Sequence, residues 1–245
     1  MLGMTTTSDP GTCGIKDIAE ALGGGIKEGS LMIIEGEAKT GKSVLCQHIA
    51  YGILSTRRTA VAYYSSEYNT DGLTVQMSSM SLDMRQDLAT DRLRVFKIYS
   101  KTVVREPQKS LKLIIEHIQR LPPYFKLIII DSPTIYFTRV NPVTKVDFLQ
   151  SCHELCGKDR SIIMVIDSHA FENKTMLRAY IMSDYYLKLR TNDAILDAGK
   201  IDTRIIKILE VTKLCGAERY AQPGMKFEIK PGLGIQILPF VHVRV

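Results

Sequence analysis

The feature that most constrains this chain is a glycine-rich segment at residues 36–43, Gly-Glu-Ala-Lys-Thr-Gly-Lys-Ser. It matches the Walker A pattern, which follows a β-strand and opens a helix in proteins that bind nucleoside triphosphates. An apolar run at 31–34 precedes the segment, and an amphipathic stretch starts near Ser43. The alternative is a glycine turn that caps a helix without binding a ligand. Because both flanks agree with the motif, the sequence predicts a P-loop.

Each part of this motif has a physical role in binding phosphate. The glycines let the backbone curl around the phosphates, so that successive N–H groups and the helix N-terminus face the negative charge. We expect Lys42 to reach the β and γ phosphates and Ser43 to bind magnesium. The predicted cofactors are therefore ATP and Mg²⁺. The predicted nucleotide contacts are Gly36, Ala38, Lys39, Thr40, Gly41, Lys42, Ser43 and Val44.

Short apolar runs alternate with segments of helical period through residue 183. The predicted strands lie at 31–34, 61–64, 93–98, 127–130 and 162–166, and the predicted helices start near Ser43, Asp71, Gln108 and Thr144. Strands that are apolar on both faces and joined by helices imply a parallel sheet covered on each side. The pattern then changes to successive strands at 185–189, 204–211, 225–229 and 234–238. The predicted fold class is α/β: a P-loop three-layer sandwich, mainly parallel, with C-terminal antiparallel strands.

The composition is that of one folded domain. A chain of 245 residues suits an undivided α/β domain, and 45% hydrophobic residues with 24% charged residues argue against disorder. Every apolar run is far shorter than the roughly 18 residues that a membrane-spanning helix needs. Residues 1–13 are polar and unlike a signal sequence, and we expect them to be flexible. We therefore predict a single domain over residues 1–245 in a cytoplasmic protein.

Charge and cysteines carry weaker information. The net charge of +6 is compatible with nucleic acid or anionic lipid, but the basic residues form no long block. We expect reduced thiols, because the chain is large enough to fold without disulfides. Cys152 and Cys156 would share one helix face, as in a metal site, but the sequence offers no second pair of ligands. Helix packing is the simpler interpretation. The five cysteines are Cys13, Cys46, Cys152, Cys156 and Cys215.

Two predicted strands end in aspartate, and either aspartate could hold magnesium beside Ser43. Asp131 ends an apolar strand and leads into Ser132, and a complete α/β unit follows it, as in multi-stranded P-loop ATPases. Asp167 ends the next strand and is the alternative. We favour Asp131 on this placement, so the predicted metal ligands are Ser43 and Asp131.

Hydrolysis also requires a group that orients the attacking water. Glu67 is the candidate, because it lies just beyond the strand predicted at 61–64, where strand ends face the phosphates. A solvated loop glutamate is the alternative. Ser168 and His169 follow the next strand, where a polar side chain can sense the γ-phosphate, but a plain surface loop explains them equally well.

Several segments together resemble the RecA/KaiC family of P-loop ATPases. The family's entry segment, an aspartate helix and a glycine cluster, resembles residues 15–18 and 22–30, and its Walker B ending resembles residues 131–132. Its Lys-x-Arg-Gly signature resembles residues 212–216, and its closing hairpin is similar to residues 227–238. The resemblance covers residues 14–239. It implies a RecA-like fold, ATP as ligand and assembly into a ring.

The sequence departs from the family pattern at two positions. KaiC-like enzymes carry a Glu-Glu pair after the second strand, whereas this chain has Ser66-Glu67. The signature arginine, which resembles an arginine finger that reaches a neighbour's γ-phosphate, is replaced by Cys215. An arginine finger contributes about 10³- to 10⁵-fold in rate, so the resemblance implies tight binding with slow hydrolysis. Lys213 remains as a catalytic candidate across a subunit interface, and Arg219 is an alternative.

Within the family, the short chain with Glu-Ala-Lys-Thr in its P-loop looks most like the ATP-binding component of the archaellum (archaeal flagellum) motor. This resemblance implies a nucleotide-gated assembly or regulatory component with weak or absent hydrolysis. The implied partners are copies of the same chain, in a hexameric ring, and the motor ATPase, the membrane platform protein and a ring scaffold. The implied location is cytoplasmic, peripheral to the membrane-embedded motor.

Two other functions stay open at this point. A DNA-dependent recombinase or ATPase agrees with the fold and the basic charge. The segments that would face DNA, 133–145 and 170–178, contain no glycine, but their aromatic residues Tyr136, Phe137 and Phe171 could stack on single-stranded DNA. A KaiC-like autokinase ranks last, because the chain has no duplicated domain.

Overall fold

The computed structural model of the chain describes most of its length. The described residues are 13–55, 59–99, 105–157, 160–192, 196–197, 200–201, 205–215 and 224–238. The segment 1–13 that we expected to be flexible lies, apart from Cys13, outside the described residues. Gly216 of the signature and the alternative Arg219 also lie outside them.

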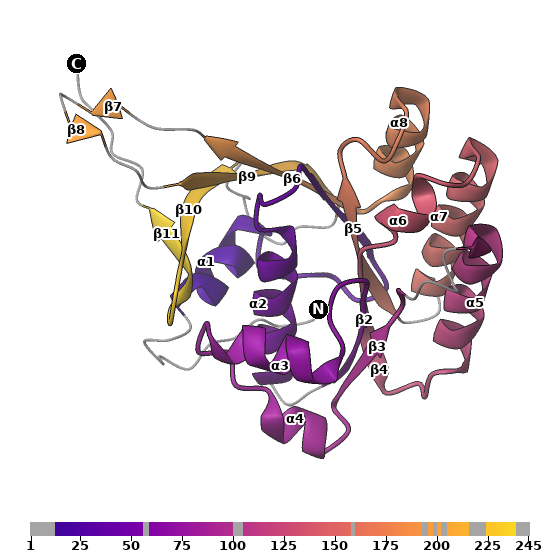
Figure 1. Ribbon diagram of the computed structural model, residues 1–245, viewed down its shortest axis with the longest axis horizontal. Coiled ribbons are helices and arrows are strands. Elements are labelled where there is room, and N and C mark those ends of the chain that lie inside the picture. Colours follow the sequence, from indigo (N-terminus) through magenta and orange to yellow (C-terminus); the bar gives the residue numbers. More distant parts are fainter. Residues whose placement is uncertain are drawn as a thin grey trace.

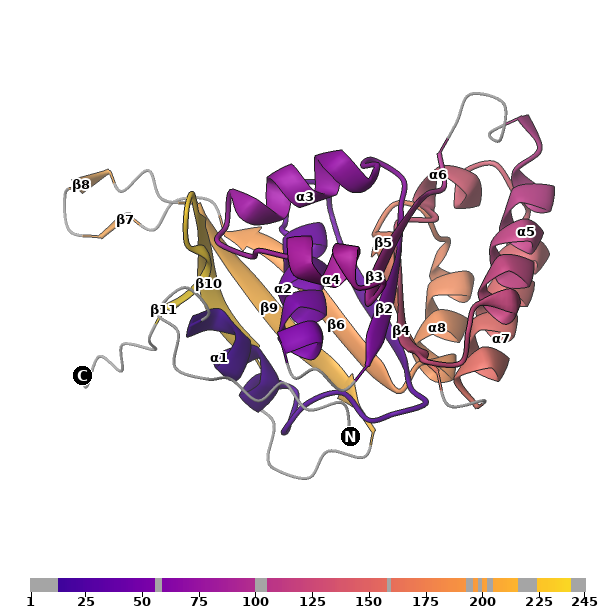
Figure 2. The same cartoon turned by 90° about the horizontal axis from the view of Figure 1, so that it is seen from below.

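One sheet runs through the described part of the molecule (Figures 1 and 2). Its strand order is β11-β10-β9-β6-β1-β5-β4-β2-β3, and all neighbours from β6 to β3 pair in parallel. Because a parallel strand between two helical layers is buried on both faces, the apolar runs coincide with the inner strands of this part more fully than with its edge strand at 93–97. Six strands form this parallel part. They are β1 (Leu31–Gly36), β2 (Ala60–Ser65), β3 (Leu93–Lys97), β4 (Phe125–Asp131), β5 (Ser161–Asp167) and β6 (Tyr185–Asn192).

Antiparallel strands extend this sheet beyond β6. β9 (Ile206–Leu214) pairs with β6, β10 (Gly224–Lys230) with β9, and β11 (Gly234–Leu238) with β10. β6 therefore joins the two parts, since it is parallel to β1 and antiparallel to β9. A small separate hairpin consists of β7 (Leu196–Asp197) and β8 (Lys200–Ile201). The predicted α/β sheet, mainly parallel with C-terminal antiparallel strands, is confirmed.

Helices cover both faces of the sheet, which makes the predicted three-layer sandwich (Figures 1 and 2). One layer contains α1 (Cys13–Ala21), α2 (Lys42–Ser55), α3 (Thr70–Ser78) and α4 (Arg85–Ala89). The other contains α5 (Pro107–Arg120), α6 (Thr134–Phe137), α7 (Pro142–Cys156) and α8 (Asn173–Met182). Proline at the first position starts both α5 and α7, where a missing backbone N–H breaks no helical bond. Among the described helices, none is both long and apolar enough to cross a membrane.

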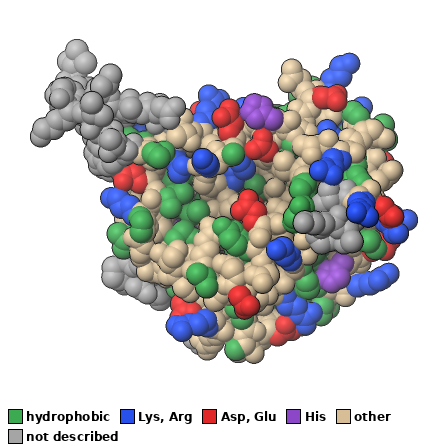
Figure 3. Space-filling model, in the orientation of Figure 1, with side chains coloured by type: hydrophobic (Ala, Val, Ile, Leu, Met, Phe, Trp, Pro, Cys, Tyr) green, Lys and Arg blue, Asp and Glu red, His purple; other side chains and the backbone are tan. Residues whose placement is uncertain are grey.

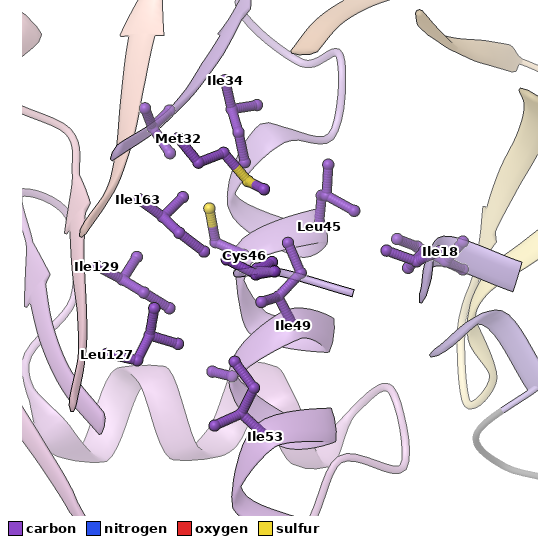
Figure 4. Packing of buried hydrophobic residues seen from close by; sticks show 14 of the residues in the cluster. Ile18, Met32, Ile34, Leu45, Cys46, Ile49, Ile53, Leu127, Ile129 and Ile163 are labelled. Atoms are coloured by element: carbon purple, nitrogen blue, oxygen red, sulfur yellow. The ribbon is translucent and has the colours of Figure 1, made fainter. Parts of the chain in front are cut away.

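Two hydrophobic cores hold these layers on the sheet. In the first, side chains of α2 pack on alternate residues of β1, β4 and β5 (Figure 4). The second lies under α5 to α8 and contains Cys152 and Cys156, both buried. This burial agrees with the packing interpretation of the two thiols. Because both faces of a strand such as β1 pack in apolar cores, polar residues that contribute to a site can lie only at the end of the strand.

The hairpin of β10 and β11 is fastened to α2 by a buried histidine. The Ile235 N–H donates to Nε2 of His48 over 3.0 Å, so this ring nitrogen must be unprotonated. Burial lowers the pKa of His48 to about 4, which keeps the ring neutral and able to accept. Gly234, with φ of +68°, lies against this ring, and a Cβ at that position would overlap it. The close approach therefore requires glycine.

We expect Gly234→Ala to destabilise the protein more than Gly232→Ala. Gly232 has a similar φ of +78°, but a Cβ there would have no heavy atom within 4 Å. Both changes introduce left-handed strain of about 1 kcal/mol, and only Gly234→Ala adds an overlap costing about 1 to 3 kcal/mol more. Urea unfolding of the two variants measures the difference. Equal losses of stability would contradict the predicted overlap of a Cβ at position 234 with the His48 ring.

Candidate nucleotide-binding site

The carboxyl ends of the parallel strands meet at one edge of the sheet, and the P-loop lies there. β1 ends at Gly36, which pairs with Asp167 at the end of β5. β4 ends at Asp131, which pairs with Ser65 at the end of β2. Ligands of open α/β sheets bind at this edge. The topology therefore gathers polar residues from four strands that are far apart in sequence.

The P-loop backbone needs its glycines. A Cβ on Gly36 would lie 2.6 Å from the Leu189 carbonyl oxygen, and Gly41 has φ of +97°. The Thr40 hydroxyl donates to the Glu37 carbonyl over 2.8 Å and fixes the turn. α2 begins at Lys42, directly after the loop, so its free N–H groups open toward the loop. The glycines let the loop pack closely against β6, and the free N–H groups at the start of α2 fit a phosphate group.

Lys42 lies across the loop. Its Nζ donates to the carbonyls of Gly36 and Glu37, each over 2.6 Å. Burial lowers the pKa of Lys42, while the carboxylates of Asp167 and Asp131 act in the opposite direction. The ammonium is therefore held at the loop, next to the place where the first turn of α2 can bind an anion.

Ser43 and Asp131 are in contact. The Ser43 hydroxyl donates to Oδ1 of Asp131 over 3.0 Å, and Oδ2 accepts from the Tyr63 hydroxyl over 2.6 Å. Burial raises the pKa of Asp131 to about 6, the hydrogen bonds from Tyr63 and Ser43 oppose the rise, and the charge of Glu67 adds to it. A buried carboxylate beside a hydroxyl supplies the hard oxygen ligands that Mg²⁺ prefers. This donor set fits the predicted metal.

Asp167 has different partners. Its side chain accepts from the His169 N–H over 3.0 Å, and its backbone N–H donates to the Thr134 hydroxyl over 3.2 Å. Ser43 thus contacts Asp131, from the more distant strand β4, although β5 is the direct neighbour of β1. The geometry favours Asp131 as magnesium ligand, and the role itself stays a prediction.

Glu67 lies at the same edge as the P-loop. It follows β2, is exposed, and its N–H donates to the Ser65 hydroxyl over 3.3 Å. Ser65, its hydrogen-bond partner, is paired with Asp131 across β2 and β4, so Glu67 follows directly on the strand end beside that carboxylate. The structure therefore brings Glu67 to the candidate site, while its action on a water molecule stays a prediction.

Lys213 is not part of this constellation. It lies on β9 opposite Tyr186, toward the edge of the sheet where β1 begins. Its Nζ donates to the carbonyls of Tyr180 and Ile181 in the last turn of α8, each over 2.9 Å. Cys215, just beyond β9, is exposed at the same edge. Any contact of these residues with a phosphate has to be with that of another copy, as the predicted role in trans requires.

Two further residues contact the site, although the sequence pattern predicts no role for them. Tyr63 lies in a predicted strand, and only its hydroxyl group distinguishes it from the apolar residues around it. Lys207 on β9 is buried, and its Nζ donates to the Lys39 carbonyl over 2.5 Å. Lys39 has φ of +66°, so this contact supports an unusual backbone conformation in the loop. The partners are 68 and 168 positions apart, a distance that no local pattern can reveal.

We expect Asp131→Asn to stabilise the protein in the absence of metal and nucleotide. The folded-state pKa of Asp131, about 6, exceeds the ordinary value of 3.8, so ionisation costs stability as the pH rises through the folded-state pKa. Asparagine stays neutral. The gain should reach about 2 to 3 kcal/mol at pH 8 and vanish below pH 4 or so.

Melting curves of the metal-free proteins between pH 4 and pH 8 provide the measurement. Asp167→Asn is the matched control, since it removes the same charge from a less buried position at the end of β5. A stability difference independent of pH would contradict the assignment of the effect to the buried charge.

Comparison with known proteins agrees with this geometry. The family model described as ATPase: KaiC matches residues 11–241. The archaeal flagellar ATP-binding protein FlaH of Sulfolobus acidocaldarius is 26% identical over 219 residues, 88% of this chain and 91% of that protein. The FlaH of Methanocaldococcus jannaschii is 43% identical over 83 residues, 34% of this chain and only 35% of that protein. The DNA repair and recombination protein RadB of Thermococcus gammatolerans is 30% identical over 125 residues, 51% of this chain and 52% of that protein.

Solved structures show the same fold. The flagellar accessory protein FlaH from M. jannaschii superposes with a TM-score of 0.78 at 22% identity, covering 97% of this chain and 98% of that chain. A KaiC-like protein from Pyrococcus horikoshii gives 0.64 at 14% identity, covering 88% and 92%. The predicted RecA/KaiC resemblance and the likeness to the archaellum ATP-binding component are thus confirmed. Since the family model covers nearly the whole chain, this chain belongs to the KaiC family of ATPases.

Proposed function

We propose that this chain is a single ATP-binding domain that acts, with Mg²⁺, as a nucleotide-gated assembly and regulatory component of the archaellum motor. Its own ATP hydrolysis is slow or depends on partners. The observation that carries the proposal is the constellation of Lys42, Ser43 and the buried Asp131 at the N-terminus of α2. Membership of the KaiC family and similarity to proteins named FlaH support it.

The residues of the site have separate tasks in this function. The N–H groups of the P-loop and of the first turn of α2 bind phosphate oxygens, and Lys42 exchanges its backbone carbonyl partners for the β and γ phosphates. Ser43 and Asp131 hold Mg²⁺. Held by these two residues, Mg²⁺ would supply positive charge that neutralises the phosphates. Glu67 orients water where hydrolysis occurs.

The archaellum role rests on similarity. The FlaH relatives are named as archaeal flagellar ATP-binding proteins, and the S. acidocaldarius protein aligns over most of its length. We propose the same class of partners: copies of this chain in a ring, the motor ATPase, the membrane platform protein and a ring scaffold. Such a protein would lie at the cytoplasmic side, peripheral to the membrane-embedded motor.

We expect slow hydrolysis because two positions, one at each end of the parallel strands, lack the charged groups that speed hydrolysis in KaiC-like enzymes. Ser66 replaces one of the two acidic residues after β2, and the neutral Cys215 replaces the arginine of the signature. A thiol cannot stabilise the charge that develops on the γ-phosphate. Lys213, the cation nearest to this position in sequence, is bonded to carbonyls of α8. ATP binding is therefore better supported than turnover.

A DNA-dependent ATPase is the second candidate, and the similarity to RadB favours it. Three features of the structure weigh against it. Tyr136, Phe137 and Phe171, the aromatic residues considered for base stacking, are all buried. Lys145 is buried too and donates to the Ala170 carbonyl over 3.0 Å. On the face seen in Figure 3, basic and acidic side chains are interspersed rather than arranged as a basic stripe.

Lys42→Ala should weaken ATP binding by about 10- to 100-fold, because hydrogen bonds to charged groups contribute about 1.5 to 3 kcal/mol each. Isothermal titration with Mg-ATP measures the affinity. Lys109→Ala is the control, since Lys109 is exposed on α5 and pairs with Glu106 away from the site. Equal ATP affinity of Lys42→Ala and the wild type would refute the P-loop assignment and with it the proposed function.

Cys215→Arg should raise ATP turnover by about tenfold or more, corresponding to about 1.4 kcal/mol of transition-state stabilisation, but only in the assembled form. The restriction follows because Cys215 lies at the edge of the sheet opposite its own P-loop. Cys215→Ser is the neutral control. Phosphate release is measured against protein concentration, with light scattering to follow assembly in ADP and in a non-hydrolysable ATP analogue. A gain in the monomer, or none in a nucleotide-dependent assembly, would contradict the role in trans.

A further inference from the structure

A buried tyrosine lies behind the carboxylate of Asp131. Tyr63, in the middle of β2, is fully buried in the core under α2. Its hydroxyl donates to Oδ2 of Asp131 over 2.6 Å. This contact is the buried hydrogen bond of the carboxyl group.

The two oxygens of Asp131 have different surroundings. Oδ2 is bonded to Tyr63 inside the core, whereas Oδ1 accepts from Ser43 at the start of α2. The backbone is held too, because the Asp131 carbonyl accepts from the Ser66 N–H over 2.8 Å. A planar carboxylate with one oxygen and its backbone fixed cannot turn without breaking the Tyr63 bond. Oδ1 is consequently kept on the side of Ser43.

We propose that Tyr63 is a positioning residue for a hard divalent cation, because its hydroxyl holds Oδ2 and thereby presents Oδ1, beside the Ser43 hydroxyl, as the ligand oxygen. This inference rests on the proposed binding of Mg-ATP and names a residue that acts on it through Asp131. Partners of ligating carboxylates orient them, and their loss typically costs about 10- to 100-fold in metal affinity. Tyr63 contributes to metal binding without touching the metal.

The neighbouring tyrosine provides a matched control. Tyr64 lies on the same strand, is 2% exposed, and its hydroxyl is bonded to Nδ1 of His117 over 2.7 Å. It points into the other core, on the opposite face of the sheet. Tyr63→Phe and Tyr64→Phe therefore each delete one buried, hydrogen-bonded hydroxyl from β2, and only Tyr63→Phe alters the surroundings of Asp131.

The experiment separates metal binding from nucleotide binding. A fluorescent ATP analogue is bound to wild type and to each variant in EDTA, and Mg²⁺ is then titrated. We expect Tyr63→Phe to weaken Mg²⁺ binding by about 10-fold or more, with metal-free nucleotide affinity unchanged. Tyr64→Phe should change neither quantity. In an Asp131→Asn background, Tyr63→Phe should have no further effect on Mg²⁺ affinity, since the two residues act as one unit.

The outcomes are distinguishable. Unchanged Mg²⁺ affinity in Tyr63→Phe, or an equal loss in Tyr64→Phe, would overturn the positioning role while leaving the proposed function intact. An additional loss in the Asp131→Asn background would also overturn it. The proposed function fails separately, if Lys42→Ala binds the analogue like the wild type. If Tyr63→Phe does not fold, Tyr63→Met replaces it, because methionine fills the space flexibly and also lacks a donor.

Discussion

The parallel pairing of β1 with β5 and β6 is the constraint on which the rest of the molecule depends. β1 is buried along its whole length, so its register is fixed by apolar contacts on both faces. A shift by one residue would move each β1 side chain from one hydrophobic core to the other. Parallel pairing also sends β1, β2, β4 and β5 to the same edge. Polar residues are excluded from the strand interiors and collect at that edge. The candidate site is thus a consequence of the same arrangement that forms the cores.

Asp131 shows where stability and binding oppose each other. Its carboxyl group is almost fully buried, and desolvation makes its ionised form unfavourable in the metal-free protein. Neither the Tyr63 nor the Ser43 hydrogen bond removes this penalty completely, because the pKa stays raised. A cation at Oδ1 would reverse the balance, since it stabilises the charged form. Asp131 would then destabilise the protein without its ligands and stabilise the protein that holds them. The proposed nucleotide gating requires such a difference, because ligand binding then changes the stability of the residues at this edge of the sheet.

Much of this architecture could be predicted from the sequence, because β1, β2, β4 and β5 contain continuous apolar runs and the helices α2, α5 and α7 have clear starts. The closeness of Asp131 to Ser43 was also predictable, since both follow strands of one parallel sheet. Short elements were not: α6 has four residues, too few for a helical period, and α8 begins after Glu172 without a side-chain cap. The segments considered as DNA-facing loops are therefore largely helical. The roles of Tyr63 and Lys207 depend on tertiary contacts, and β-propensity alone explains a tyrosine in a strand.

The proposed role of Lys213 in a ring has to start from the contacts that Lys213 makes within one copy. Its ammonium is bonded to two carbonyls at the end of α8 and lies 5.3 Å from the centre of the Tyr180 ring. A cation at a helix C-terminus stabilises the helix, and the exposed position means that water can replace these bonds at little cost. Moving Lys213 to a neighbour's γ-phosphate would thus exchange a weak contact for a strong one and release the last turn of α8. ATP in one copy would then act on α8 of the next, whereas ADP, without a γ-phosphate, would leave that turn capped. In the proposed ring, these two hydrogen bonds would be the contacts whose loss couples the γ-phosphate of one copy to α8 of the next.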